Sequence, residues 1–130
     1  MSSTRDEFYL DLFTTAIEGG INYWAYTDKY HWMIGPTAVD VEEPSRPDYR
    51  GFYADITEED PDDGDGKHRI DRQVITAGYG LATTTYRDRI FWSSGEPPPL
   101  VVTDDTDWDF DAGDADVIVQ LGLFGKVIYG

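Results

Sequence analysis

Cysteine is absent from this 130-residue sequence, lysine occurs three times and histidine twice. Without cysteine the chain can form neither disulfide bonds nor thiolate metal sites. No apolar run approaches the ~20 residues that a membrane-spanning helix needs, and the first twelve residues lack the apolar core of a signal peptide. These absences predict an intracellular, cytoplasmic protein without a membrane partner.

The sequence also lacks the common catalytic motifs. His31 and His68 are not in a two-histidine ligand pattern; we expect His31 to be half-buried on a strand and His68 to be exposed. Ser93 and Ser94 are not in a Gly-x-Ser-x-Gly elbow, and the Gly-Tyr-Gly of residues 78–80 is too short for a phosphate-binding loop. We therefore predict a noncatalytic protein with no cofactor.

Acidic residues dominate the charge, since 26 Asp and Glu against 10 Lys and Arg give a formal net charge of −16. Such a charge repels nucleic acid phosphates and anionic membranes, and it attracts cationic partners. We expect no direct binding to nucleic acid. High acidity also has a simpler interpretation, because it keeps a protein soluble and suits a salty cytoplasm.

The length suits one domain over residues 1–130, with a single hydrophobic core. Apolar residues recur at helical spacing in three stretches, which predicts helices over about residues 5–18, 69–82 and 114–124. Gly125 is expected to end the last helix, because glycine readily adopts the left-handed conformation found there. Gly78 and Gly80 are costly inside a helix, which suggests close packing against another element.

Aromatic and β-branched residues indicate strands between these helices. Residues 21–34 form either a hairpin that turns at residues 27–29 or one long irregular strand. Further short strands are predicted at residues 38–42, 51–57 and 100–103, followed by a strand-like tail at 126–129. The predicted fold class is α+β, a small antiparallel sheet with about three helices packed on one face.

Two acidic loops, at about residues 58–66 and 104–113, are the predicted partner-binding segments, because they are too polar to be buried. The predicted binding carboxylates are Glu58, Glu59, Asp60, Asp62, Asp63, Asp65, Asp104, Asp105, Asp107 and Asp109. The alternating aspartates that start at Asp105 and end at Asp116 resemble a twelve-residue calcium loop. Phe110 stands where that loop needs glycine, and Asp116 replaces the usual glutamate, so no metal site is predicted.

An aromatic run of five Tyr and Trp residues lies within residues 23–32. Most such runs form the core face of a sheet, but alternation leaves a second face available. If Tyr26 and Trp32 are exposed, they would favour a homodimer or a contact with another protein, since Tyr and Trp often anchor interfaces.

Two stretches carry a resemblance to a known class of protein. Residues 18–24 read EGGINYW, and residues 115–130 read ADVIVQLGLFGKVIYG. Both are similar to stretches in small accessory proteins of tailed phages that infect actinobacteria and related hosts. The resemblance implies a phage or prophage origin and a location in the host cell, and it supplies no catalytic residue.

These observations lead to two hypotheses. The first is an acidic accessory protein that binds a basic host protein, as a DNA mimic that inhibits a nuclease or another DNA-binding factor. The second is a structural or assembly protein that associates with itself through an aromatic face of the sheet.

Overall fold

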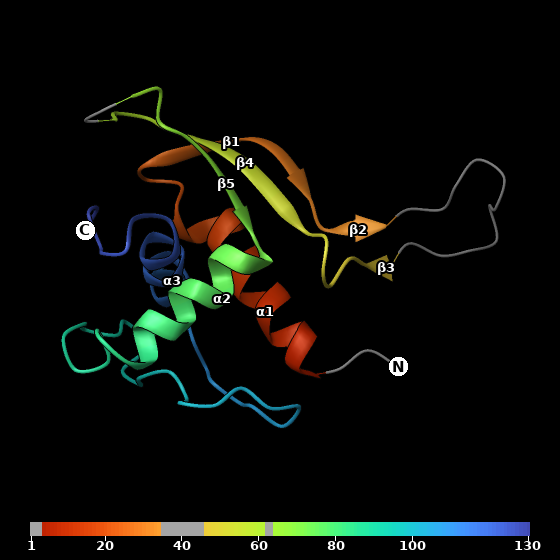
Figure 1. Ribbon diagram of the computed structural model, residues 1–130, viewed down its shortest axis with the longest axis vertical. Helices are drawn as coiled ribbons and strands as arrows, with labels where there is room; N and C mark the ends of the chain where they lie inside the picture. Colours follow the sequence, from red (N-terminus) through yellow and green to blue (C-terminus); the bar gives the residue numbers. More distant parts are fainter. Residues whose placement is uncertain (1–3, 35–45, 62–63) are drawn as a thin grey trace, which may run out of the picture.

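The computed structural model describes residues 4–34, 46–61 and 64–130, and it confirms the α+β class (Figure 1). The predicted strand at 38–42 lies outside the described residues. Along the chain the elements are α1 (Thr4–Thr15), the π-helical turn η1 (Ala16–Gly20), β1 (Ala25–His31), β2 (Met33–Ile34), β3 (Arg46–Pro47), β4 (Tyr53–Glu58), β5 (Lys67–Asp71), α2 (Arg72–Thr83) and α3 (Ala112–Phe124).

The main sheet is antiparallel with strand order β1-β4-β5, and β2 pairs with β3 in a separate two-stranded ladder. All three helices lie on one side of the main sheet, and its other side is open (Figure 1). This arrangement is the predicted one. Strand β4 occupies the centre because its Ala54 and Ile56 side chains are fully buried beneath the helices.

The aromatic run forms one long irregular strand rather than a hairpin. The register of β1 against β4 shifts between Thr27 and Lys29, so the proposed turn is instead a β-bulge centred on Asp28. A bulge inserts one extra residue and reverses which residues face each side. Tyr26 therefore faces the open side, whereas Tyr30 faces the helices and packs on Phe13.

The second predicted helix began too early. Residues 67–71 form strand β5, and α2 starts only at Arg72, after the Asp71 side chain accepts a hydrogen bond from the Val74 amide at 3.0 Å. The buried face of α2 follows the 3.6-residue period of the helix. It consists of Ile75, Gly78, Tyr79 and Ala82.

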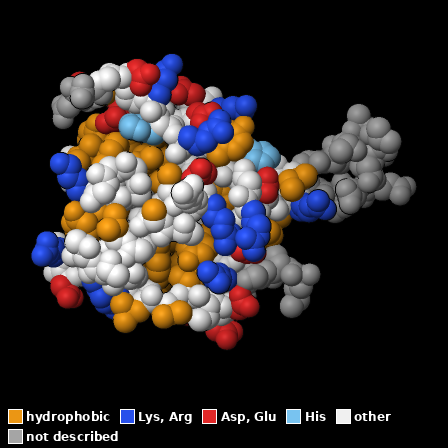
Figure 2. All heavy atoms as spheres, viewed as in Figure 1, with side chains coloured by type: hydrophobic (Ala, Val, Ile, Leu, Met, Phe, Trp, Pro, Cys, Tyr) orange, Lys and Arg blue, Asp and Glu red, His pale blue; other side chains and the backbone are white. Residues whose placement is uncertain are grey.

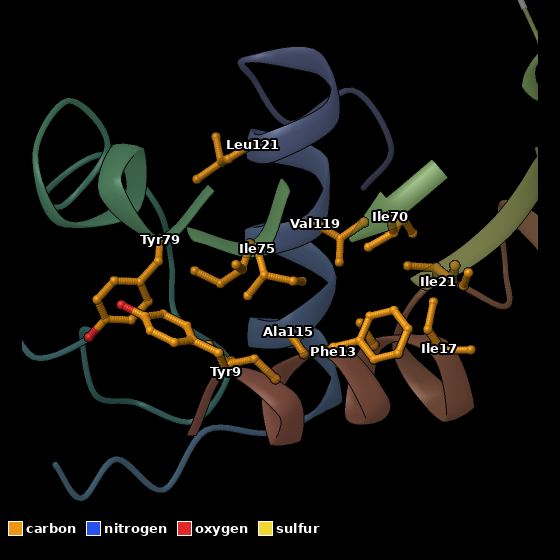
Figure 3. Close-up of a cluster of buried hydrophobic side chains, with 14 of the residues drawn as sticks. Tyr9, Phe13, Ile17, Ile21, Ile70, Ile75, Tyr79, Ala115, Val119 and Leu121 are labelled. Atoms are coloured by element: carbon orange, nitrogen blue, oxygen red, sulfur yellow. The ribbon is translucent and has the colours of Figure 1, made fainter. Parts of the chain in front are cut away.

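Helix α3 lies at the centre of the core, with apolar side chains of α1, η1, β5 and α2 packed around it (Figure 3). It starts at Ala112, with Asp111 and Asp114 forming a reciprocal capping box, and ends at Gly125 with a φ of 72°. A Cβ atom on Gly78 would lie 1.9 Å from the Ile118 carbonyl oxygen, so α2 and α3 cross in direct backbone contact. The close packing predicted for Gly78 is confirmed, whereas Gly80 faces open space.

The two stretches that carry the phage resemblance contact each other. Gly20 closes η1 against α3, where a Cβ atom would lie 2.7 Å from the Ala112 carbonyl oxygen. The Tyr129 ring stacks on the Trp24 ring, with a centroid separation of 4.8 Å and an interplanar angle of 8°. The tail is not a strand. It folds back on α3, where the Gln120 side chain binds the backbone of Ile128 and Tyr129.

Residues 84–111 connect α2 to α3 without a regular helix or strand, so the strand predicted at 100–103 is wrong. Trp92 and Trp108 anchor this connection, since both are buried and their rings meet edge to face at 5.8 Å. The Trp108 indole also donates a hydrogen bond to the Glu96 carbonyl oxygen at 3.1 Å. Buried tryptophan side chains thus hold in place a segment that has no regular pattern of backbone hydrogen bonds.

Candidate functional site

The two acidic segments lie at opposite ends of the molecule. Residues 58–66 form the tip of the β4–β5 hairpin, and residues 104–111 run along the far end, below α1 and α2 in the view of Figure 1. Acidic side chains on the face in Figure 2 are interspersed with Lys and Arg rather than gathered in one patch. The carboxylates of the two segments therefore do not form one continuous surface.

Glu58 was predicted to lie in the exposed acidic loop, and this prediction is wrong. It is the last residue of β4, is 8% exposed, and accepts a hydrogen bond from the Tyr129 hydroxyl. His68, predicted to be exposed, is half-buried with Nε2 2.8 Å from Glu58 Oε2. Burial raises the pKa of Glu58, but the hydrogen bonds from Tyr129 and His68 outweigh burial and lower the pKa below its ordinary value.

The rest of the hairpin tip agrees with the predicted exposure. Glu59, Asp60 and Asp65 are exposed, and Asp65 accepts a hydrogen bond from the Lys67 amide at 3.0 Å. Asp62 and Asp63 lie outside the described residues. The hairpin tip therefore retains exposed carboxylates, although Glu58, one of the predicted partner-binding residues, is buried.

The 104–111 segment exposes Asp104, Asp105, Asp107 and Asp109, as predicted. It runs beside α1, and together they form a hollow of about 170 Å³ that we call the acidic hollow. Its lining consists of Glu7, Phe8, Asp11, Thr106, Asp107, Trp108 and Phe110. Burial and the negative charge of Glu7 both raise the pKa of Asp11. Three carboxylates thus meet beside aromatic rings at this end.

The calcium-like series of aspartates is divided by the start of α3. The Asp111 side chain caps the helix by accepting a hydrogen bond from the Asp114 amide at 3.0 Å. Asp116 lies inside the helix and is 5% exposed. Within the described ranges, no three His, Asp or Glu side chains gather as a metal site.

Asp116 is the centre of a buried polar cluster that the sequence did not reveal. Its carboxylate accepts hydrogen bonds from Trp24 Nε1 at 2.8 Å, Tyr23 Oη at 2.7 Å and Gln120 Nε2 at 3.1 Å. Burial raises the pKa of Asp116, and these three neutral donors offset that effect without reversing it. The cluster joins α3 to the turn between η1 and β1, and we assign it a structural role.

The open side of the sheet carries a second, shallower hollow of about 540 Å³. Arg69 binds Asp55 along it with two hydrogen bonds, at 2.7 and 2.9 Å, and the Arg69 guanidinium lies 4.2 Å from the Tyr53 ring centroid. Tyr26 lines this hollow and is 51% exposed. The face thus combines one Arg–Asp ion pair with the exposed Tyr26 ring.

Tyr26 and Trp32 are both exposed, the condition set for an aromatic contact, but they do not share a face. The Trp32 ring stacks with Tyr30 at 6.4 Å, on the helix side of the strand. Tyr26 is on the open side, because the bulge at Asp28 lies between them. The single aromatic face proposed for a homodimer or host contact is therefore not formed by this pair.

His31 is half-buried, as expected, at the end of β1. Its Nε2 lies 2.8 Å from Asp48 Oδ2, and its ring stacks on Tyr53 at 5.4 Å. Burial raises the pKa of Asp48, but the hydrogen bonds from His31 and the Gly51 amide outweigh burial and lower it. This pair ties β1 to the turn before β4.

In the described part of the chain, none of the helices has both the length and the apolar content to span a membrane. Comparisons of the chain with models of protein families, with curated proteins and with solved structures find no match.

Proposed function

We propose that this protein is a noncatalytic binding protein whose acidic hollow receives a Lys or Arg side chain from a cationic segment of a partner protein. One observation carries the proposal: Glu7, Asp11 and Asp107 line the same hollow as Phe8, Trp108 and Phe110. Among the described residues that line it, three are acidic and none is basic.

Electrostatics favours a cation in this position. The pKa of Asp11 is raised by burial and by Glu7, so the ionised carboxylates repel each other across a partly desolvated space. A guanidinium or ammonium group would relieve this repulsion, and the aromatic rings would add a cation–π contribution of about 0.5–1 kcal/mol. The net charge of −16 would also accelerate the approach of a basic partner.

DNA mimicry is a narrower form of the same proposal. A mimic must present carboxylates at intervals like those of phosphates, and the two acidic segments lie at opposite ends. Mimicry would therefore depend on the 104–111 end alone. The resemblance to phage accessory proteins supports a basic host protein, such as a nuclease, as the partner.

The test is a calorimetric titration with a short arginine- and glycine-rich peptide. We expect affinity to fall steeply between about 0.01 M and about 1 M salt, over which the screening length shrinks from roughly 30 Å to roughly 3 Å. The double variant Asp11→Asn with Asp107→Asn should weaken binding about tenfold at low salt, because it removes two of the three carboxylates that line the acidic hollow.

The matched control is Glu59→Gln with Asp60→Asn at the hairpin tip, which removes the same two negative charges from exposed positions. It should change affinity less than about twofold, the effect of distant, screened charges. Equal weakening by both double variants would show that only net charge matters, and the acidic hollow would not be the binding site.

A further inference from the structure

Three of the ten basic residues converge on one hollow at the start of α1 and α2. This hollow has a volume of about 370 Å³ and is lined by Arg5, Asp6, Arg50, Arg72 and Asp104; we call it the arginine hollow. Figure 2 shows Lys and Arg side chains gathered over the start of α2 on this face. The convergence is unusual in a chain whose net charge is −16.

Arg72 is held rigidly at the base of the arginine hollow. Its side chain is 18% exposed, it donates to the Tyr49 carbonyl oxygen at 2.9 Å, and it pairs with Asp6 at 2.8 Å. Its guanidinium also lies 5.0 Å from the Tyr9 ring centroid. Because these contacts fix the plane of the guanidinium, a ligand that meets it would lose little side-chain entropy in Arg72.

Arg50 is an accessible cation of the arginine hollow. Its side chain is 78% exposed, and its Nη2 lies 3.9 Å from Asp6 Oδ2, which is beyond hydrogen-bonding distance. Most of its five N–H donors therefore face solvent, toward the same space as Arg72.

The acidic side chains of the hollow do not cancel its positive charge. Asp6 is bound by Arg72, and Asp104 lies 3.4 Å from the Arg5 amide. Three arginines against two aspartates leave one positive charge among the lining residues. At physiological ionic strength the effect of more distant negative charge decays over a screening length of about 8 Å.

We propose that the arginine hollow binds a phosphate group, either free or at the end of a small phosphate ester. Planar guanidinium groups donate pairs of parallel hydrogen bonds to phosphate oxygens, and two arginines from different segments can hold a tetrahedral dianion from two sides. None of its lining residues also lines the acidic hollow. It is independent of the proposed function.

The test is an NMR titration of the arginine Nε–Hε signals with inorganic phosphate, in parallel with chloride and acetate at equal ionic strength. We expect the signals of Arg50 and Arg72 to shift with phosphate in a saturable way, while the exposed Arg89, outside the hollow, does not respond. An equal response to acetate would overturn the assignment of phosphate, and a response of Arg89 equal to theirs would overturn the site.

Variants give a second measurement that does not depend on signal assignment. Arg50→Gln should weaken phosphate binding by about tenfold in calorimetry, because it removes a charge-assisted donor pair at an exposed position. Arg89→Gln is the matched control, since it removes the same charge elsewhere on the surface, and should leave the affinity unchanged. The proposal fails if Arg50→Gln binds phosphate as the wild type does, or if both variants lose affinity equally.

Discussion

The two acidic segments have similar compositions, and the structure uses them differently. Residues 58–66 form a hairpin tip whose described carboxylates face solvent, apart from Glu58. Residues 104–116 are tied to the core by Trp108, they cap α3 through Asp111, and they place Asp116 inside the helix bundle. Composition therefore identifies polar segments without revealing which of their carboxylates a partner can reach.

Glu58 in the first segment and Asp116 in the second are both buried, and their pKa values shift in opposite directions. Burial is the largest influence on both Glu58 and Asp116, and it raises both pKa values. Glu58 ends with a lowered pKa because His68 and Tyr129 favour its charged form. Asp116 has only neutral donors as partners, so burial prevails and its pKa remains raised. The difference teaches that burial and the hydrogen-bond partners of a carboxylate together decide the sign of its pKa shift.

The largest effect should come from removing the Asp116 carboxylate. Asp116→Ala leaves the buried Trp24 indole and Gln120 amide donors without their acceptor, which should reduce the free energy of unfolding by about 3 kcal/mol. Urea unfolding measures this loss. Asp116→Asn, which keeps one acceptor oxygen, should lose less, and equal losses would contradict a role through hydrogen bonding.

The pH dependence of stability should separate the two buried carboxylates. The pKa of Glu58 is lowered on folding, so its stabilisation is complete above the ordinary value of 4.5 and is lost as pH falls through the folded pKa. The pKa of Asp116 is raised, so its ionisation costs stability as pH rises above 3.8.

Glu58→Gln should therefore make the free energy of unfolding fall less steeply below about pH 4.5. It should also lower the free energy of unfolding by roughly 1–2 kcal/mol at pH 7. Asp116→Asn should remove the decrease in unfolding free energy that accompanies ionisation of Asp116 as pH rises above 3.8. Unfolding free energies measured from acid to neutral pH test both variants, and slopes that change in the same direction would contradict the comparison.

A smaller effect should distinguish the helix cap from the exposed carboxylates. Asp111→Ala removes the side chain that accepts from the Asp114 amide, and should cost about 1 kcal/mol. Asp60→Ala at the hairpin tip should change stability by less than about 0.5 kcal/mol, as is usual for exposed side chains. Thermal unfolding of the two variants side by side measures the difference, and equal melting temperatures would remove the assigned capping role.

Local signals in the sequence predicted the elements whose stability depends on neighbours along the chain. The helical spacing in α1 and α3 and the C-terminal Gly125 are signals of this kind, and the structure confirms them. The predicted start of the second helix was wrong, because Ile70 fits a helical period and a strand alternation equally well. Ile70 belongs to a strand because it pairs with Ala54 of β4.

The candidate site was less predictable. The exposure of the carboxylates in the 104–111 segment follows from composition, but their meeting with Glu7 and Asp11 depends on where α1 packs. The bulge at Asp28 likewise has no signal in the sequence, yet it separates Tyr26 from Trp32. The arginine hollow joins residues from four distant segments, and no spacing along the chain indicates it.

By itself, the sequence determined the charge, the α+β class and the ends of the best-defined helices, because these depend on composition and on contacts within a few residues. Tertiary structure alone decided which carboxylates are buried, which side each aromatic ring faces and which charges meet. Those outcomes depend on contacts between residues far apart in the chain, such as Trp24 with Asp116 and Tyr129 with Glu58. Such contacts form only when the helices close on the sheet.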